Sequence, residues 1–174
     1  MKTYIVLFRG INVGGNNILP MKELVTLLEA HGYQNVKTYI QSGNVVLQSN
    51  KASSSEIATL VADKYGFKPA VLVLDRSAFD AAIKNNPFHL AEGKQAHFYF
   101  CSKVPKLNAE KLDKYISGSE QHELKGKVFY LFAPDGIGRS KLVANIESCL
   151  GVPATGRNLN TVNKLGEMVG ECGI

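Results

Sequence analysis

The pattern of apolar and polar residues predicts alternating strands and helices. Unbroken apolar and β-branched runs at 3–8 and 70–74 predict buried strands, and 36–41 and 45–48 predict two strands joined by a turn. Apolar residues recur at helical spacing after Pro20 and after Ser53, and Gly32 and Gly66 end these two helices. The resulting order, β-α-β-β-α-β, is the ferredoxin-like order.

The second part of the chain repeats most of this order without obvious residue identity. A short helix at 76–84 and Pro87 precede it, and β-α-β-β-α follows with a helix at 139–150, a closing helix at 158–169 and a frayed tail at 170–174. We therefore predict an α+β fold with two ferredoxin-like halves from a structural duplication, in which helices pack on antiparallel or mixed sheets. The halves are residues 1–87 and 88–174, expected to form one compact body.

Composition adds a weak preference for an anionic partner. The net charge of +5 is spread over both halves, so it favours an anionic partner only through long-range attraction. Alternatively, the protein is a soluble protein that happens to be basic. Three distant cysteines without a CxxC pair fit a reducing cytoplasm. No apolar stretch has membrane-spanning length, and the four histidines lack metal-ligand spacing, so we expect no membrane partner, no metal and no cofactor.

The loop at 8–17 is the first candidate site. Gly10 and Gly15 have the spacing of a phosphate-binding G-x-x-x-x-G loop, but Asn16 and Asn17 replace the lysine and hydroxyl residue that complete it. A Walker-type NTPase is therefore not indicated. Backbone N–H groups beside glycine and the Arg9 guanidinium can still bind an anion. Alternatively, the glycines and asparagines shape turns and Arg9 pairs with an acidic neighbour.

The hairpin at 38–44 is the second candidate. Tyr39 on an exposed sheet face could stack a base, although a tyrosine in such a strand is more often an ordinary core or half-buried residue. Ser42 lacks the surroundings of a nucleophile, and Gly or Asn in the segment 42–44 is expected to take the positive φ of the turn.

Two further segments place arginine at predicted helix starts, where free N–H groups favour anions. They are 155–161, with Arg157, and 136–141, with Arg139; capping chemistry by Asn158 or Asn160 is the alternative reading of the first. We expect the segments of Arg9 and Arg157 to meet and line one positively charged hollow. The predicted ligand-binding residues are Arg9, Gly10, Asn12, Gly14, Gly15, Asn16, Tyr39, Gln41, Ser42, Asn44, Arg139, Arg157, Asn158 and Asn160.

Three motifs carry a resemblance to a known family. The segments RGINVGG at 9–15, TYIQSGNVV at 38–46 and RNLNTVNKL at 157–165 resemble a bacterial family catalogued as a domain of unknown function, with the signature RGINVGG…TYIQSGNVVF…RNWNTV. Leu47 stands where Phe is common and Leu159 where Trp is common. The resemblance extends over essentially the whole chain and implies a duplicated α+β fold with ferredoxin-like halves. It implies no activity, cofactor or catalytic residue.

The sequence therefore leads to three functional hypotheses. The first is a cytoplasmic protein that binds a phosphate-bearing ligand, either a nucleotide or a nucleic acid. The alternatives are an enzyme that acts on a small phosphorylated metabolite and a module for protein interaction.

Overall fold

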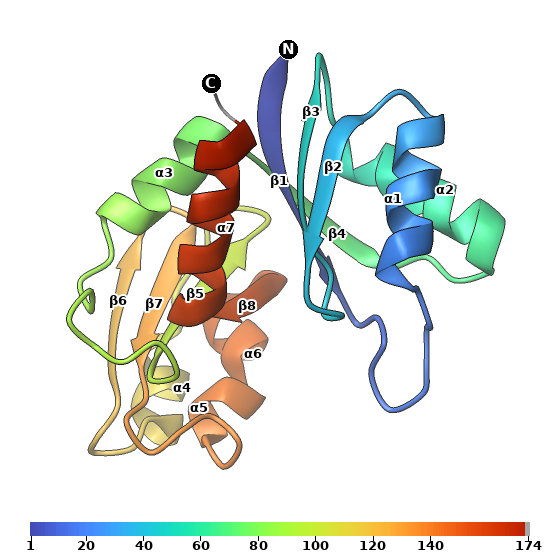
Figure 1. Cartoon of the computed structure of the whole chain (residues 1–174). Coiled ribbons are helices and arrows are strands. Elements are labelled where there is room, and N and C mark those ends of the chain that lie inside the picture. Colours follow the sequence, from blue (N-terminus) through green and yellow to red (C-terminus); the bar gives the residue numbers. More distant parts are fainter. Residues whose placement is uncertain (173–174) are drawn as a thin grey trace. The chain divides into compact units, whose positions relative to one another are not determined.

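The computed structural model describes residues 1–172, and the chain divides into two compact units (Figure 1). The first unit comprises Met1–Ala81 together with the residues from Asn163 onward, and the second comprises Ala82–Val162. The division falls inside two helices, α3 (Arg76–Lys84) and α7 (Leu159–Cys172), whereas the sequence placed the link between halves at residues 87 and 88.

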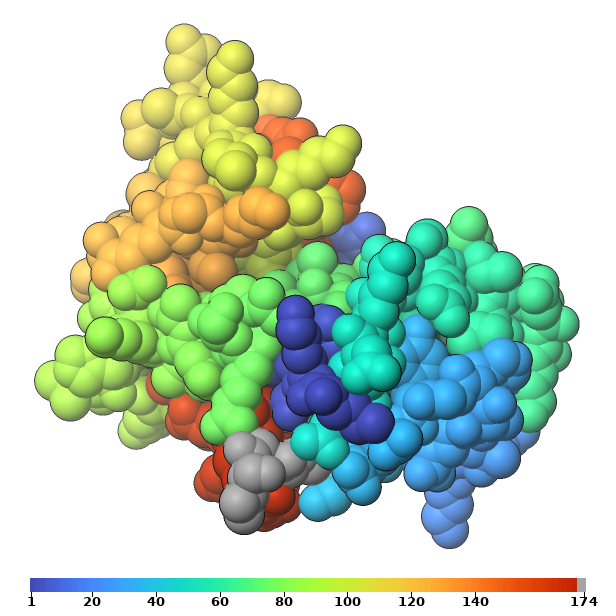
Figure 2. Space-filling view, turned by 90° about the horizontal axis from the view of Figure 1, so that it is seen from above, coloured from blue at the N-terminus to red at the C-terminus, as the bar shows by residue number. Residues whose placement is uncertain are grey.

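The first unit has the ferredoxin-like order that its sequence predicts. Its remaining elements are β1 (Lys2–Arg9), α1 (Met21–Ala30), β2 (Gln34–Tyr39), β3 (Asn44–Ser49), α2 (Ser54–Tyr65) and β4 (Ala70–Asp75). The antiparallel sheet has the strand order β2-β3-β1-β4. Figure 2 shows the N-terminal residues of β1 beside the end of β3, where Lys2 pairs with Ser49.

Helices α1 and α2 cover one face of this sheet (Figure 1). The apolar residues of α1 recur at helical spacing, so that Leu24 and Leu28 lie on one buried side against Val6 and Phe8 of β1. Helix α2 begins directly after Ser53, as predicted, and the Ser53 hydroxyl caps it by accepting a hydrogen bond from the Glu56 N–H.

The second unit repeats the topology completely. Its elements are β5 (Ala96–Cys101), α4 (Ala109–Tyr115), β6 (Gln121–Lys125), β7 (Val128–Phe132), α5 (Lys141–Ala144), α6 (Ile146–Leu150) and β8 (Ala154–Asn158). The antiparallel strand order is β6-β7-β5-β8, position for position the order of the first sheet. The prediction of two ferredoxin-like halves in an α+β fold is therefore confirmed.

Strand β8 corrects the prediction for 155–161. The first part of this segment is a strand, in which Thr155, Gly156 and Arg157 pair with Phe100, Tyr99 and Phe98 of β5, and α7 starts within the segment, at Leu159. Arg157 is thus a strand residue that precedes the helix start, and anion binding at this helix N-terminus stays a prediction.

The two C-terminal helices also differ from their predicted bounds. The predicted helix at 139–150 is divided at Asn145 into α5 and α6, and Arg139 lies before α5. Helix α7 continues to Cys172, so most of the tail predicted to fray is helical; Gly173 and Ile174 lie outside the described residues.

Candidate functional site

The glycine loop between β1 and α1 contains a tight reverse turn. Val13 and Asn16 form an isolated antiparallel bridge, and the Asn16 N–H donates to the Val13 carbonyl over 2.9 Å. Gly14 and Gly15 between them have φ values of 57° and 77°. Positive φ at both central residues is the requirement of a type I′ turn, which accounts for the glycine pair without a ligand.

Asn12 and Asn17 hold the rest of this loop in place. The Asn12 amide donates to the carbonyls of Leu19 (2.9 Å) and Gln41 (2.8 Å), and its oxygen accepts from the Leu19 N–H (2.7 Å). The Asn17 amide donates to the Gly10 carbonyl over 3.0 Å. Both asparagines therefore have structural roles, and Asn12 ties the loop to the start of α1 and to the turn between β2 and β3.

The β2–β3 turn lies against the glycine loop, to which Asn12 ties it. The turn residues are 40–43, with positive φ at Ile40 (51°) and Gly43 (93°), whereas Asn44, predicted to be in the turn, is the fully buried first residue of β3. The Asn44 amide donates to the Tyr39 carbonyl (3.0 Å) and the Ser42 hydroxyl (3.1 Å).

The backbone N–H of Phe8 donates to the Gly43 carbonyl over 2.8 Å. Together with the Asn12 contact to Gln41, this bond brings the first two sequence motifs together at one end of the first sheet. The exposed apolar side chains at this end are Val13, Ile18 and Ile40. The ligand-binding role assigned to this loop and hairpin stays a prediction.

Changing Asn12 to Ala is expected to destabilise the first unit by about 2 to 4 kcal/mol. The change removes three hydrogen bonds and places Ala at a φ of 53°, a conformation that costs side chains other than Gly and Asn about 1 kcal/mol or more. Urea unfolding measures the change. Asn16→Ala in the same loop is the control, because the exposed Asn16 side chain makes no hydrogen bond to the described residues; equal effects of the two changes would refute the role of Asn12.

Residues 157–162 of the third motif belong to the second unit, and Asn158 and Asn160 among them also have local partners. The Asn158 oxygen accepts from the Thr161 N–H (2.9 Å), which caps α7 as the alternative reading proposed, and Asn160 lies against the backbone of Gly93. The Nη1 of Arg157 donates to the Gly156 carbonyl over 2.9 Å. Arg9 belongs to the first unit and Arg157 to the second, so their meeting in one hollow stays a prediction.

A hollow of about 400 Å³ in the second unit gathers positive charge. We call it the basic hollow, and its lining residues are Lys114, Tyr115, Ile116, Ser117, Glu120, Asp135, Gly136, Arg139, Ser140 and Lys141. They come from the end of α4, the approach to β6 and the segment between β7 and α5. Arg139 is the predicted site residue in this group.

The two carboxylates of the basic hollow are occupied by neutral donors. Glu120 accepts from the Ser117 N–H (2.8 Å) and the Ser140 hydroxyl (2.6 Å), and Asp135 accepts from the Ser119 hydroxyl (2.6 Å). These contacts fix the hollow's walls. They also leave its cations without carboxylate partners.

The three cations of the hollow are Lys114, Arg139 and Lys141. All three are exposed, and none of them forms an ion pair with any of the residues 1–172. The ammonium of Lys114 lies 5.4 Å from the centre of the Tyr115 ring. Three cations around one hollow can share a multiply charged anion.

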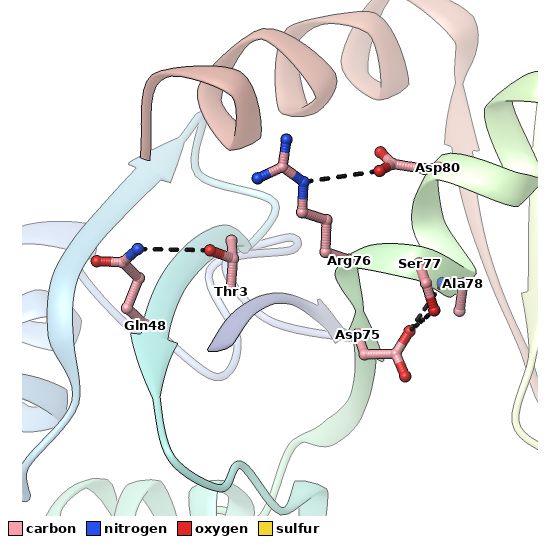
Figure 3. A network of polar contacts seen from close by, with 7 residues as sticks. All are labelled: Thr3, Gln48, Asp75, Arg76, Ser77, Ala78 and Asp80. Atoms are coloured by element: carbon pink, nitrogen blue, oxygen red, sulfur yellow. Dashed lines mark hydrogen bonds and ion pairs between the residues drawn. The ribbon is translucent and has the colours of Figure 1, made fainter. Parts of the chain in front are cut away.

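A hollow in the first unit, of about 420 Å³, has a different character (Figure 3). Asp75 there accepts from the Ser77 hydroxyl (3.1 Å) and the Ala78 N–H (2.7 Å), which caps α3. Arg76 pairs with Asp80 over 3.6 Å. The charged side chains of Asp75 and Arg76 thus serve the start of α3, and this hollow is a weaker candidate.

The comparisons with known proteins establish the family. The family model described as "Protein of unknown function (DUF1697)" matches residues 1–130. The chain belongs to this family. The DUF1697 match includes the glycine loop, the β2–β3 turn and Lys114, and it ends before Arg139, Lys141 and Arg157.

A solved structure extends the similarity to the rest of this DUF1697 chain. It is described as the structure of conserved bacterial protein SP0830 from Streptococcus pneumoniae, with 26% identity and a TM-score of 0.72. The match covers 97% of this chain and 98% of the other. No curated protein matches.

Two of the three cations in the basic hollow were not predicted from the sequence as site residues. Lys114 and Lys141 are ordinary helix lysines in sequence, and only their positions near Arg139 single them out. Within residues 1–172, no helix has the length and apolar character needed to cross a membrane, and no cluster of three or more His, Cys, Asp or Glu offers a metal site.

Proposed function

We propose that this protein binds a small phosphate-bearing ligand of nucleotide type in the basic hollow. The observation that supports the proposal is the grouping of Lys114, Arg139 and Lys141 around one hollow, without carboxylate partners among the described residues. The guanidinium of Arg139 offers paired donors to phosphate oxygens, and the two ammonium groups add point charges.

The shape and charge of the hollow favour a compact ligand over a nucleic-acid strand. A volume of about 400 Å³ lies in the range of small-molecule sites. Glu120 and Asp135 line the same hollow and would repel a phosphodiester backbone that continued past the cations. The Tyr115 ring offers a surface on which a base can stack.

The direct test changes Lys114, Arg139 and Lys141 to Ala together and measures ATP and pyrophosphate binding by calorimetry. We expect the dissociation constant to rise about 100-fold, because each lost charged contact contributes on the order of 1 kcal/mol or more. The control changes three exposed lysines of the first unit, Lys22, Lys51 and Lys68, which lowers the net charge equally.

A specific site predicts weaker binding only in the variant of the basic hollow, whereas general charge attraction predicts equal weakening in both variants. Equal weakening in both variants, or no binding by the unchanged protein, would reject the basic hollow as the site. Hydrolysis of the bound ligand would favour the alternative of an enzyme that acts on a phosphorylated metabolite. A steep salt dependence with single-stranded nucleic acid and none with ATP would favour the nucleic-acid reading.

The state of the cysteines supports a cytoplasmic location for this function. Cys101 and Cys149 are free and buried, and burial raises the pKa of the Cys101 thiol to about 11. Unpaired, protonated thiols are typical of proteins in a reducing compartment.

A further inference from the structure

A second hollow in the second unit has a different chemistry from the basic hollow. It has a volume of about 310 Å³ and lies at the β5–β8 edge of the sheet. We call it the histidine hollow, and its lining residues are His97, Tyr99, Ile137, Gly156, Arg157 and Asn158. Arg157 and Asn158 are predicted site residues that the proposed phosphate site leaves unused.

His97 supplies a hydrogen-bond acceptor that has no partner among residues 1–172. The residue is only 6% exposed, and its Nε2 lies 3.1 Å from the Lys94 carbonyl oxygen. A carbonyl only accepts, so Nε2 carries the proton, and burial lowers the pKa of the ring and keeps it neutral near pH 7. Nδ1 is then an acceptor, and it bonds to none of the described residues.

Tyr99 contributes a second polar group to this hollow. The residue is 6% exposed, and its hydroxyl forms no hydrogen bond with the described residues. Burial, with a smaller contribution from Glu120, raises the pKa of Tyr99 to about 12, so the hydroxyl is a donor at neutral pH. Gly156 lets the ring lie close to β8, because a Cβ there would be 2.7 Å from the ring carbon Cε1.

The opposite strand adds positive charge and further donors. Arg157 is half-buried, and loss of solvent lowers its pKa only to about 10, so the guanidinium remains charged. The Asn158 oxygen is occupied by the Thr161 N–H, and its amide N–H groups have no partner among the described residues. The hollow thus combines one neutral acceptor with a cation and several donors.

We propose that the histidine hollow binds a small carboxylic acid that also carries an N–H or O–H donor. The carboxylate would lie against Arg157, Asn158 and the Tyr99 hydroxyl, and the donor would bond to His97 Nδ1. Such a ligand bonds to the His97 Nδ1 and the Tyr99 hydroxyl at once, in place of the water that can reach them in the hollow. A fully ionised phosphate has no donor for Nδ1, so the site selects against it.

The test measures binding of N-acetylglycine, which has a carboxylate and an N–H donor, against acetate, which lacks the donor. Calorimetry gives the affinities, and nitrogen NMR of the His97 ring reports directly on Nδ1. We expect N-acetylglycine to bind at least about tenfold more tightly than acetate and to shift the Nδ1 resonance. Affinities that do not differ, or an Nδ1 resonance that does not respond, would overturn the proposal.

Two variants and one matched control locate the effect. His97→Phe and Arg157→Gln should each weaken N-acetylglycine binding about tenfold or more, with folding checked by circular dichroism. His122→Phe is the control, because His122 lies on β6 of the same sheet, stacked on Phe129 and outside the hollow. Equal losses of binding in all three variants would overturn the assignment. If His97→Phe does not fold, Arg157→Gln alone decides, and unchanged binding in that variant would overturn the assignment.

The triple variant of Lys114, Arg139 and Lys141 separates this inference from the proposed function. It should retain N-acetylglycine binding while it loses ATP binding. Joint loss in a folded protein would contradict a separate acid site in the histidine hollow.

Discussion

Changing Gly43 to Ala is expected to destabilise the protein by about 3 to 5 kcal/mol, the largest effect of any single methyl addition we foresee. The φ of Gly43 is 93°, which a residue with a Cβ adopts only under strain. The new Cβ would also lie 2.6 Å from the Phe8 Cβ and 2.8 Å from the Ile11 Cδ1. Both neighbours are buried in the first core and have little room to move.

Gly66→Ala is the matched control for this prediction. Gly66 ends α2 with a φ of 80°, and a Cβ there would meet nothing within 4 Å. It should cost only the backbone strain, about 1 kcal/mol. Urea unfolding of both variants measures the difference, and a Gly43→Ala variant no less stable than Gly66→Ala would show that the turn moves freely away from Phe8.

The protein is expected to lose several kcal/mol of unfolding free energy between pH 9 and pH 12. Burial raises the pKa of Tyr99 and Tyr130 to about 12 and that of Cys101 to about 11, from ordinary values of 10.0, 10.0 and 9.0. These groups stay neutral in the folded state at pH values where the unfolded state has released its protons. Their contribution is therefore complete below pH 9 and is lost as pH rises, by roughly 2 to 3 kcal/mol for each group.

Urea unfolding at a series of pH values, under reducing conditions, measures this loss. Tyr130→Phe should show a shallower decline above pH 10, because one of the three groups no longer titrates. At neutral pH the same variant should be less stable by about 1 to 2 kcal/mol, since the Tyr130 hydroxyl donates to the Ala82 carbonyl over 2.6 Å in the core. A stability that stays constant from pH 9 to pH 12 would contradict the assigned burial effects.

Local patterns predicted most of the fold because hydrophobic spacing and local structure agree in most segments. Helix α3 (Arg76–Lys84) has the predicted bounds, and α2 begins directly after Ser53, where the sequence placed it. Strand β8 was not predicted from the sequence, because Gly156, Arg157 and Asn158 have little strand preference of their own. Pairing with β5, a contact between distant segments, holds them extended.

The turn between β2 and β3 shows a similar limit. A β-branched residue at positive φ is unusual, so sequence reasoning assigned that conformation to Gly or Asn. Gly43 does adopt it, but Ile40 also does, while Asn44 is fully buried and bonds to the Tyr39 carbonyl. The hydrogen bonds from Asn12 and Phe8 to the turn fix this geometry, and the sequence of 38–44 alone does not predict these bonds.

The candidate sites were predictable only in part. Arg139, Arg157 and Asn158 were identified as site residues because they stand near glycine or asparagine in loops and element ends. Lys114 lies 25 positions before Arg139 in sequence, and only the packing of α4 near the start of α5 places both in one hollow. His97 is one of four histidines without metal-ligand spacing, and the sequence does not single it out, because the availability of its Nδ1 is a property of the fold.

The division of the chain inside α7 has a consequence for how the protein is made. The ribosome delivers the second unit, residues 82–162, as one continuous piece. The first unit also needs the residues from Asn163, including the buried Leu165 and Val169 and the Glu171 carboxylate that pairs with Lys37. Strand β1 must therefore wait for the residues from Asn163 onward before its unit is complete, and a nascent chain arrested before residue 163 should carry an unfinished first unit.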